Sequence, residues 1–203
     1  MKHLLFTLFA ALVFGGATFA QRLQIGFRAG ANLTDYSFTP VEVGTIRVSR
    51  GAVRAGFETG LVLRLNIARH LHLQSELNYR MVNYEVNVQG AGRRTISLRT
   101  ERLEIPLELG LQFGVFRLFG GAVFRVANAA RSSAPRLLKV DFNNSDIGLM
   151  GGVGLNIRKF FIDFRMSGYP RSHVWQTFRS DGVSQRAKVS HDIVYGGSLG
   201  FFF

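Results

Sequence analysis

The segment RLEIPLELGLQF, residues 102–113, alternates apolar and polar side chains with a period of two. One set of alternate positions is entirely apolar: Leu103, Ile105, Leu107, Leu109, Leu111 and Phe113. The other set carries Arg102, Glu104, Glu108 and Gln112. Successive side chains of a strand point to opposite faces, so this segment predicts a strand with one apolar and one charged face. Strands of this kind are typical of membrane β-barrels, in which lipid-facing and lumen-facing residues alternate.

The same alternation recurs along the chain and predicts eight strands. They cover residues 24–36, 55–68, 71–86, 100–113, 116–127, 147–157, 162–166 and 191–203. In the third segment the pattern shifts near Val82, where Tyr84 and Val86 would take over the lipid-facing positions. A β-bulge is expected there.

The connections between these segments are alternately long and short, which supports the strand count independently. Long connections are expected at residues 37–51, 87–99, 128–145 and 168–190, and short turns at 69–70, near 114 and at 158–159. Short periplasmic turns, long extracellular loops and an even strand number place both termini in the periplasm. The predicted fold is all-β, an eight-stranded antiparallel transmembrane β-barrel with up-and-down meander topology. Tyr36, Phe38, Tyr84, Tyr169 and Trp175 are expected to form an aromatic belt near the loops.

The N-terminal residues resemble an export signal rather than part of the fold. Lys2 precedes an apolar run, and Thr18 and Ala20 provide the small residues of a cleavage site. We therefore expect residues 1–20 to be a removable signal peptide and residues 21–203 to be the barrel domain. The chain has no cysteine, so no disulfide supports the fold.

Charged residues at the lumen-facing positions form a predicted network inside the barrel. Its members are Glu58, Arg64, Glu76, Arg80, Glu104, Glu108, Arg125, Asp163 and Arg165. An eight-stranded barrel is just wide enough for side chains to fill its interior, so we expect a plug of ion pairs. Strand adjacency should bring Glu76 and Arg80 beside Glu104 and Glu108. A ligand or proton site in the lumen is the alternative interpretation.

The net charge of +12 raises the question of an anionic partner. The basic residues are mostly single arginines between apolar residues, and no nucleic-acid-binding module is recognisable, so nucleic acid is not an expected partner. Most charged residues in the long connections are Arg or Lys. Guanidinium groups bind phosphate well, so we expect these loops to contact phosphates of outer-membrane lipid and glycolipid. A protein partner at the extracellular loops is a further expectation.

Catalytic and metal-binding patterns are weak in this sequence. Ser190, His191 and Asp192 are consecutive, so on a strand they cannot form a triad among themselves. His70 and His72 could share one face, but they lack a clear third metal ligand. Asp141, Asn143 and Ser145 could provide oxygen ligands for calcium, but the glycine and the terminal glutamate of a calcium-binding loop are missing. We therefore expect no catalytic residues, no cofactor and no metal.

Three stretches resemble the PorT-like family of outer-membrane β-barrel proteins: IGFRAGANL at 25–33, LHLQSELNYRMVNYEV at 71–86 and RLEIPLELGLQF at 102–113. The final GFFF at 200–203 is similar to the closing strand of that family. The resemblance implies an eight-stranded barrel in the outer membrane, inserted by the barrel assembly machinery, and it implies no reaction. The expected function is thus a non-enzymatic outer-membrane barrel with a structural or partner-binding role. Two alternatives are a secretion-system-associated binding barrel and a lipid-modifying enzyme.

Overall fold

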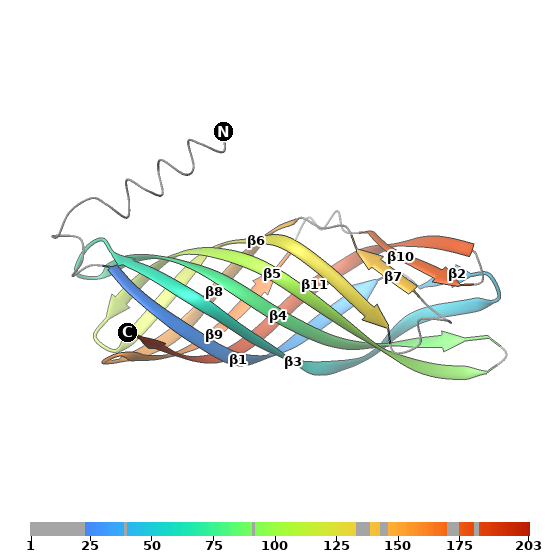
Figure 1. The fold of residues 1–203 in the computed structure, drawn as a ribbon, viewed down its shortest axis with the longest axis horizontal. Coiled ribbons are helices and arrows are strands. Elements are labelled where there is room, and N and C mark those ends of the chain that lie inside the picture. The colour runs from blue at the N-terminus through green and yellow to red at the C-terminus, as the bar shows by residue number, and fades with distance from the viewer. Residues whose placement is uncertain are drawn as a thin grey trace, which may run out of the picture.

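The computed structural model describes residues 23–38, 40–90, 92–132, 139–142, 146–169, 175–180 and 183–203, so the expected signal peptide lies outside the described residues. Eight long strands form one closed antiparallel ring (Figure 1). They are β1 (Leu23–Phe38), β3 (Ile46–Asn66), β4 (Leu71–Gln89), β5 (Arg93–Phe113), β6 (Phe116–Ser132), β8 (Asp146–Ile157), β9 (Phe160–Gly168) and β11 (Val183–Phe202). Each pairs with the next, and β1 pairs with β11 to close the barrel. The predicted eight-stranded meander is confirmed.

Short strands occupy segments that were predicted to be loops. β2 (Val41–Val43) pairs with β3, and β10 (Trp175–Ser180) pairs with both β11 and β7 (Lys139–Phe142). The long strands also run further than expected, since β4 and β5 remain paired as far as Gln89 and Arg93. The prediction of long connections at 37–51 and 87–99 is therefore wrong, because most of these residues belong to strands. No helix in the described part of the chain is long and apolar enough to cross a membrane.

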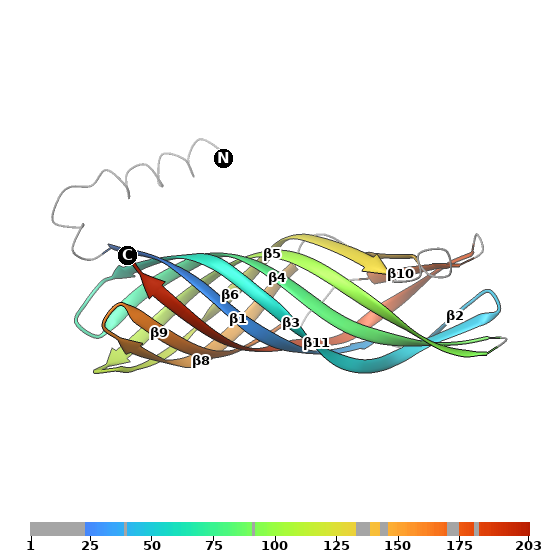
Figure 2. The ribbon, with the colours of Figure 1, turned by 60° about the horizontal axis from the view of Figure 1, so that its bottom comes forward.

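The short turns and the described ends of the chain lie at one end of the barrel, which we call the turn end (Figure 2). The opposite end, reached by β2, β7 and β10, is the loop end. Gly114 and Arg158 sit in two of the tight turns with φ of 61° and 57°. Arginine rarely adopts this left-handed conformation, so the turn at Arg158 is mildly strained.

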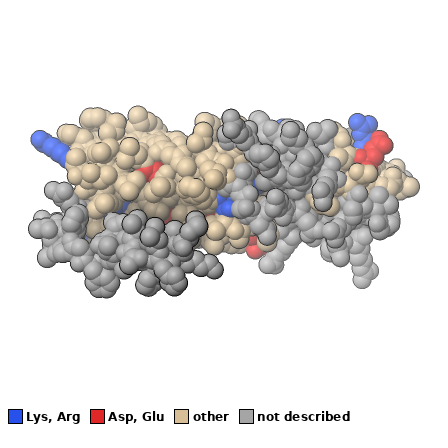
Figure 3. Space-filling view, turned by 90° about the horizontal axis from the view of Figure 1, so that it is seen from above, with Lys and Arg blue, Asp and Glu red and all other residues tan. Residues whose placement is uncertain are grey.

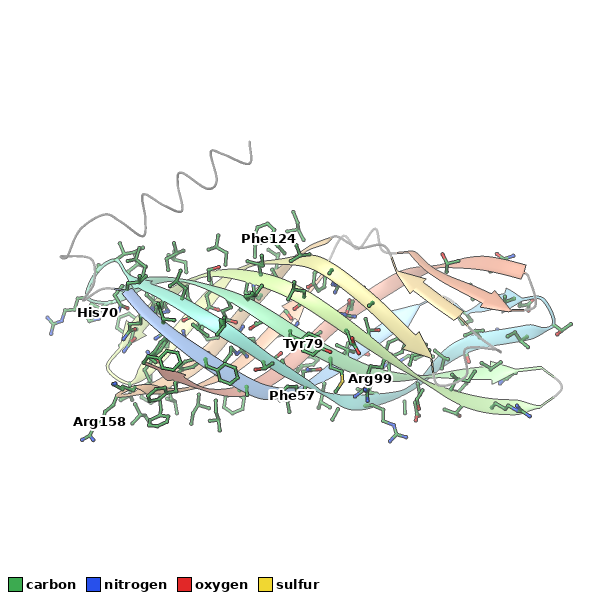
Figure 4. The ribbon with its side chains drawn as sticks, viewed as in Figure 1. Phe57, His70, Tyr79, Arg99, Phe124 and Arg158 are labelled. Carbon is green, nitrogen blue, oxygen red and sulfur yellow. The ribbon has the colours of Figure 1, made fainter. Side chains whose placement is uncertain are left out.

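The outer surface divides the barrel into two sections of opposite polarity. The belt section (residues 25–33, 57–81, 101–126, 147–166 and 193–203) exposes apolar side chains all round, and one face of it is nearly free of charge in Figure 3. The loop section (residues 41–55 and 82–100) exposes mainly polar groups, including the ion pairs Arg50–Asp35 and Arg54–Glu85, each 2.5 Å long. Figure 4 places Phe57, Tyr79 and Phe124 near the middle of the long axis, with Arg99 closer to the loop end.

The polarity of the interior also reverses at the boundary between the belt section and the loop section. Along β4 the inward side chains are polar from His72 to Arg80, and then Val82, Tyr84, Val86 and Val88 follow on the same face. The strand keeps one phase throughout, so the predicted shift and bulge near Val82 are wrong, and so is the outward assignment of Tyr84 and Val86. The irregularities lie in the neighbouring β3, between Arg50 and Val53 and between Arg54 and Phe57.

Inward glycines make the narrow lumen possible. Gly60 is paired with Asn78 on the next strand, and Gly110 with His72. A Cβ atom on Gly60 would lie 1.9 Å from Asn78 Oδ1, and one on Gly110 would lie 2.1 Å from His72 Nε2. The same relation joins other inward pairs: Gly154 with Asp163, Gly152 with Phe119, and Gly200 with Phe161. Each large inward side chain thus fills the space that a glycine leaves open.

Pro106 faces the lumen in the middle of β5. The β4–β5 ladder is interrupted there, between the pairs Ser75–Leu107 and Asn78–Glu104. The register between β5 and β6 shifts nearby, at Leu103 and Glu104. An irregular ladder is the expected response of a closed sheet to a residue that cannot donate a hydrogen bond.

Candidate functional site

The structure places all nine predicted network residues inside the barrel, and all nine are buried. Arg28, Arg102, Arg117 and Asp192 join them there. Among the described residues, the lumen therefore contains seven buried arginines and six buried carboxylates. Together these groups form one chain of contacts along the axis of the belt section.

The end of this chain nearest the loop section is built around two shared carboxylates. Asp192 on β11 accepts hydrogen bonds from Arg102 at 3.2 Å and from Arg125 at 2.8 Å. Glu104 lies 3.8 Å from Arg125 and 2.7 Å from Arg80. The predicted proximity of Arg80 and Glu104, inferred from strand adjacency, is present in the structure.

The middle of the chain crosses the lumen from wall to wall. Glu58 accepts a 2.9 Å hydrogen bond from Arg80 and also pairs with Arg28. Arg28 on β1 reaches Glu76 on β4 at 2.8 Å, and Arg165 on β9 binds both oxygens of Glu76 at 2.9 Å. Glu76 thus bridges two arginines from distant strands rather than the residues of β5 beside it. Bidentate arginine–carboxylate pairs are among the strongest hydrogen-bonded contacts in proteins.

Towards the turn end the chain continues through a second pair of carboxylates. Arg165 lies 3.6 Å from Asp163 and 3.9 Å from Glu108. Arg117 pairs with Asp163 and lies 3.4 Å from Glu108. Each of these two acids therefore faces two arginines, as each acid in the rest of the chain does.

The chain ends on a neutral amide rather than on another acid. Gln74 Oε1 accepts hydrogen bonds from Arg117 at 2.9 Å and from Arg64 at 2.6 Å. The Arg64 guanidinium stacks on the Phe202 ring, 4.4 Å from its centroid. Arg64 is the seventh arginine, and no acidic partner within the described residues accompanies it in an ion pair.

Tyr169 belongs to this interior and not to an outer aromatic belt, so its predicted lipid-facing position is wrong. Its hydroxyl donates a 2.9 Å hydrogen bond to Glu104, and the Arg125 guanidinium carbon lies 3.8 Å from its ring centroid. The residue packs with Phe119, Val123 and Met150 on the β6–β8 side of the lumen. Of the other proposed belt residues, Tyr84 is also internal, and the side chains of Tyr36, Phe38 and Trp175 are outside the described set.

The residues considered for catalysis or metal binding are dispersed. Asp192 is held by Arg102 and Arg125, while the side chains of Ser190 and His191 fall outside the described set. His72 is buried in the lumen, but His70 is exposed in a turn, with its Nδ1 2.9 Å from Gln112 O. The suggestion that the two histidines share a face is therefore wrong.

The described residues contain no group of three or more His, Cys, Asp or Glu side chains placed to hold a metal ion. Asn143 and Ser145 lie outside the described residues, as does the side chain of Asp141. The calcium ligands considered in the sequence therefore lie outside the part of the chain whose side chains the structure describes.

Asp192 is a network member that the sequence analysis considered only as part of a catalytic triad. Its inward position follows from the alternation of the strand predicted at 191–203, because the apolar Ile193 and Tyr195 take the lipid-facing positions and the residue before Ile193 then faces the lumen. The same alternation turns Arg28, Arg102 and Arg117 inward, but their partners across the lumen carry no sequence signal.

Comparison with known proteins agrees with this geometry. Residues 19–167 match the family described as Outer membrane protein beta-barrel domain. Among solved structures, OprG from Pseudomonas aeruginosa aligns with a TM-score of 0.58 at 11% identity, covering 89% of this chain and 95% of OprG. Ail from Yersinia pestis, in complex with the heparin analogue sucrose octasulfate, aligns with a TM-score of 0.47 at 11% identity, covering 90% and 99%. No curated protein sequence matches. The chain belongs to the outer membrane protein beta-barrel domain family and is an integral β-barrel of the outer membrane.

Proposed function

We propose that this protein is a non-enzymatic outer-membrane barrel whose interior is a structural plug and whose loop end has a structural or partner-binding role. The observation that carries the proposal is the continuous chain of ion pairs from Arg102 to Arg117. Every acid in it contacts two arginines, so the lumen is filled by groups that bind one another. A buried pair that loses one member leaves an uncompensated charge, commonly at a cost of about 3 to 5 kcal/mol, which favours a closed and rigid interior.

The turn end faces the periplasm in this proposal, and the loop section stands outside the cell. Short turns on the periplasmic side are usual for bacterial outer-membrane barrels. Residues 1–20 act as the removable export signal, and the barrel assembly machinery recognises the aromatic final strand. Within the family we assign the chain to the PorT-like members, on the resemblance of residues 25–33, 71–86 and 102–113.

The partner that we propose for the loop section is phosphorylated glycolipid of the outer leaflet. Arg47 and Arg99 are exposed on its outer surface. Arg99 lies two register rows beyond the last pair of the apolar belt, Met81 and Glu101, and is paired with Asn83 on β4. Headgroup phosphates lie at that level when the belt section fills the hydrocarbon layer. A protein partner at the same surface, as in a secretion-associated barrel, is the second candidate for this role.

Single-channel recording tests the plug directly. The mature barrel, refolded and inserted into a planar lipid bilayer, should show no steady ionic conductance, because the chain of ion pairs occupies the lumen. Glu85→Ala, which alters only an outer-surface pair, should stay equally closed. A stable, ohmic conductance in the wild-type barrel would show an open lumen and contradict the proposal.

A further inference from the structure

The turn end of the barrel carries a marked excess of positive charge. Its described cations are Arg64, Arg69, Arg117, Arg158 and Lys159. The described acids at this end are Glu108 and Asp163, and both already pair with Arg117. Figure 4 places His70 and Arg158 together at this end. A region of the protein that carries one sign of charge concentrates ions of the opposite sign.

Arg64 is the focus of this excess. Its side chain is 2% exposed, its Nε donates to the neutral Gln74, and its Nη2 atom is buried without a hydrogen-bond partner. The Nε atom of Arg117, whose Nη1 also binds Gln74, is likewise unpartnered. A guanidinium does not lose its proton in a protein, and a buried charge without a counter-charge is costly. A counter-charge from solution would remove that cost.

Among the described residues, the polar side chains between Arg64 and the turns include no acid. Four of them are half-buried amides, Gln24, Asn66, Gln112 and Asn156, which we call the amide mouth. They are joined in pairs, with Asn66 Nδ2 donating to Gln24 Oε1 at 3.3 Å and Asn156 Nδ2 to Gln112 Oε1 at 2.6 Å. Neutral amide groups do not repel an anion, and they bind it more weakly than a cationic side chain does. An anion can therefore pass them on its way to Arg64.

We propose that the turn end of the lumen binds one small monovalent anion of halide size at Arg64 Nη2, between the amide mouth and the first internal carboxylates. The anion completes the alternation of charge, so that the seventh arginine faces a counter-charge as the other six do. Glu108 and Asp163 lie in the same part of the lumen, where both pair with Arg117, and their negative charges disfavour a larger or more highly charged anion.

The test measures thermal unfolding of the refolded barrel in neutral detergent while chloride replaces gluconate at constant ionic strength. For the wild-type barrel we expect a saturating rise in the unfolding temperature of about 2 to 4 °C, since a ligand that binds only the folded state stabilises it by mass action. Arg69→Gln, which removes an exposed cation at the same end, should keep this response. Arg64→Met should abolish it.

A second variant keeps the test decisive if Arg64→Met fails to refold. Gln74→Glu retains Arg64 and places a carboxylate where the amide now accepts its hydrogen bond, so the response to chloride should disappear whatever the absolute stability. In crystals grown with bromide, an anomalous peak beside Arg64 Nη2 is expected. An unfolding temperature indifferent to chloride, a response that survives in both variants, or a site holding only water would overturn the proposal.

Discussion

The belt section and the loop section are built from the same strands, but their polarity is reversed. The belt section has apolar side chains outside and charged ones inside, whereas the loop section has polar side chains outside and apolar ones inside. Along β4, Leu77 and Tyr79 face outward and Glu76 and Arg80 inward, whereas a few residues later Glu85 faces outward and Val86 inward. The backbone alternates identically in both. The difference shows that alternation defines two faces, while the surrounding solvent decides which of them is apolar.

The two sections are also stabilised in different ways. In water, the apolar interior of the loop section gains from the hydrophobic effect like the core of a soluble protein. Its members include Val43, Val48, Val86, Ile96 and Leu98, which are nearly inaccessible. In the belt section the outer residues are about as well solvated by lipid tails as by each other, so this driving force is weak. There the backbone ladder and the buried ion pairs must specify the structure.

The largest contrast should come from removing one carboxylate in each section of β4. Glu76→Ala removes one of the two carboxylate partners of Arg28 and the bidentate partner of Arg165, and leaves both charges buried, so the free energy of unfolding should fall by about 3 to 5 kcal/mol. Glu85→Ala removes the partner of Arg54, which is 62% exposed, and should cost at most about 1 kcal/mol. Urea unfolding of the two variants in lipid vesicles measures both values. Equal losses would mean that the lumen is hydrated and that the chain of ion pairs contributes little to the free energy of unfolding.

A positive charge added to the outer face should next locate the boundary between the sections. Leu77→Arg places a guanidinium in the apolar belt and should destabilise the barrel by about 2 to 4 kcal/mol. Asn83→Arg adds the same side chain six residues further along the same outer face, in the loop section, where the change should be near zero. The same vesicle assay compares them. If Asn83→Arg proved as costly as Leu77→Arg, the hydrocarbon layer would extend over the loop section and the boundary after Met81 would be wrong.

The sequence was sufficient for the belt section because a single rule, apolar outward, holds there on all eight strands. The same rule failed beyond Met81. Applied to Tyr84 and Val86, it required a shift of phase, although the strand simply leaves the lipid and exchanges the contents of its two faces. The strand residues that were predicted to be loops were mispredicted for the same reason. Their outward side chains are polar, and such a segment resembles a solvated connection in the sequence.

The partners inside the lumen could be predicted only between neighbouring strands. Arg80 and Glu104 are close because β4 and β5 pair, and pairing follows from chain order. Arg165 and Glu76 meet across the barrel, and that contact depends on strand tilt and on how far each side chain reaches. Neither quantity has a local sequence signature. The inward glycines, however, mark where a large neighbour will lie, because each gives its space to the residue paired with it.

The smallest of these contrasts uses that glycine rule. Gly60→Ala in the belt section adds a methyl group 2.7 Å from the Leu77 carbonyl oxygen and closer still to Asn78, so overpacking should cost about 1 to 3 kcal/mol. Gly92→Ala in the loop section meets no atom within 4 Å and should change the free energy of unfolding by less than about 0.5 kcal/mol. Restoring space with Asn78→Ala should rescue Gly60→Ala in part, because the two substitutions act on one contact. If Gly60→Ala were neutral in the vesicle assay, the lumen would have spare volume beside Gly60. That result would contradict the proposal that side chains fill the lumen of the belt section.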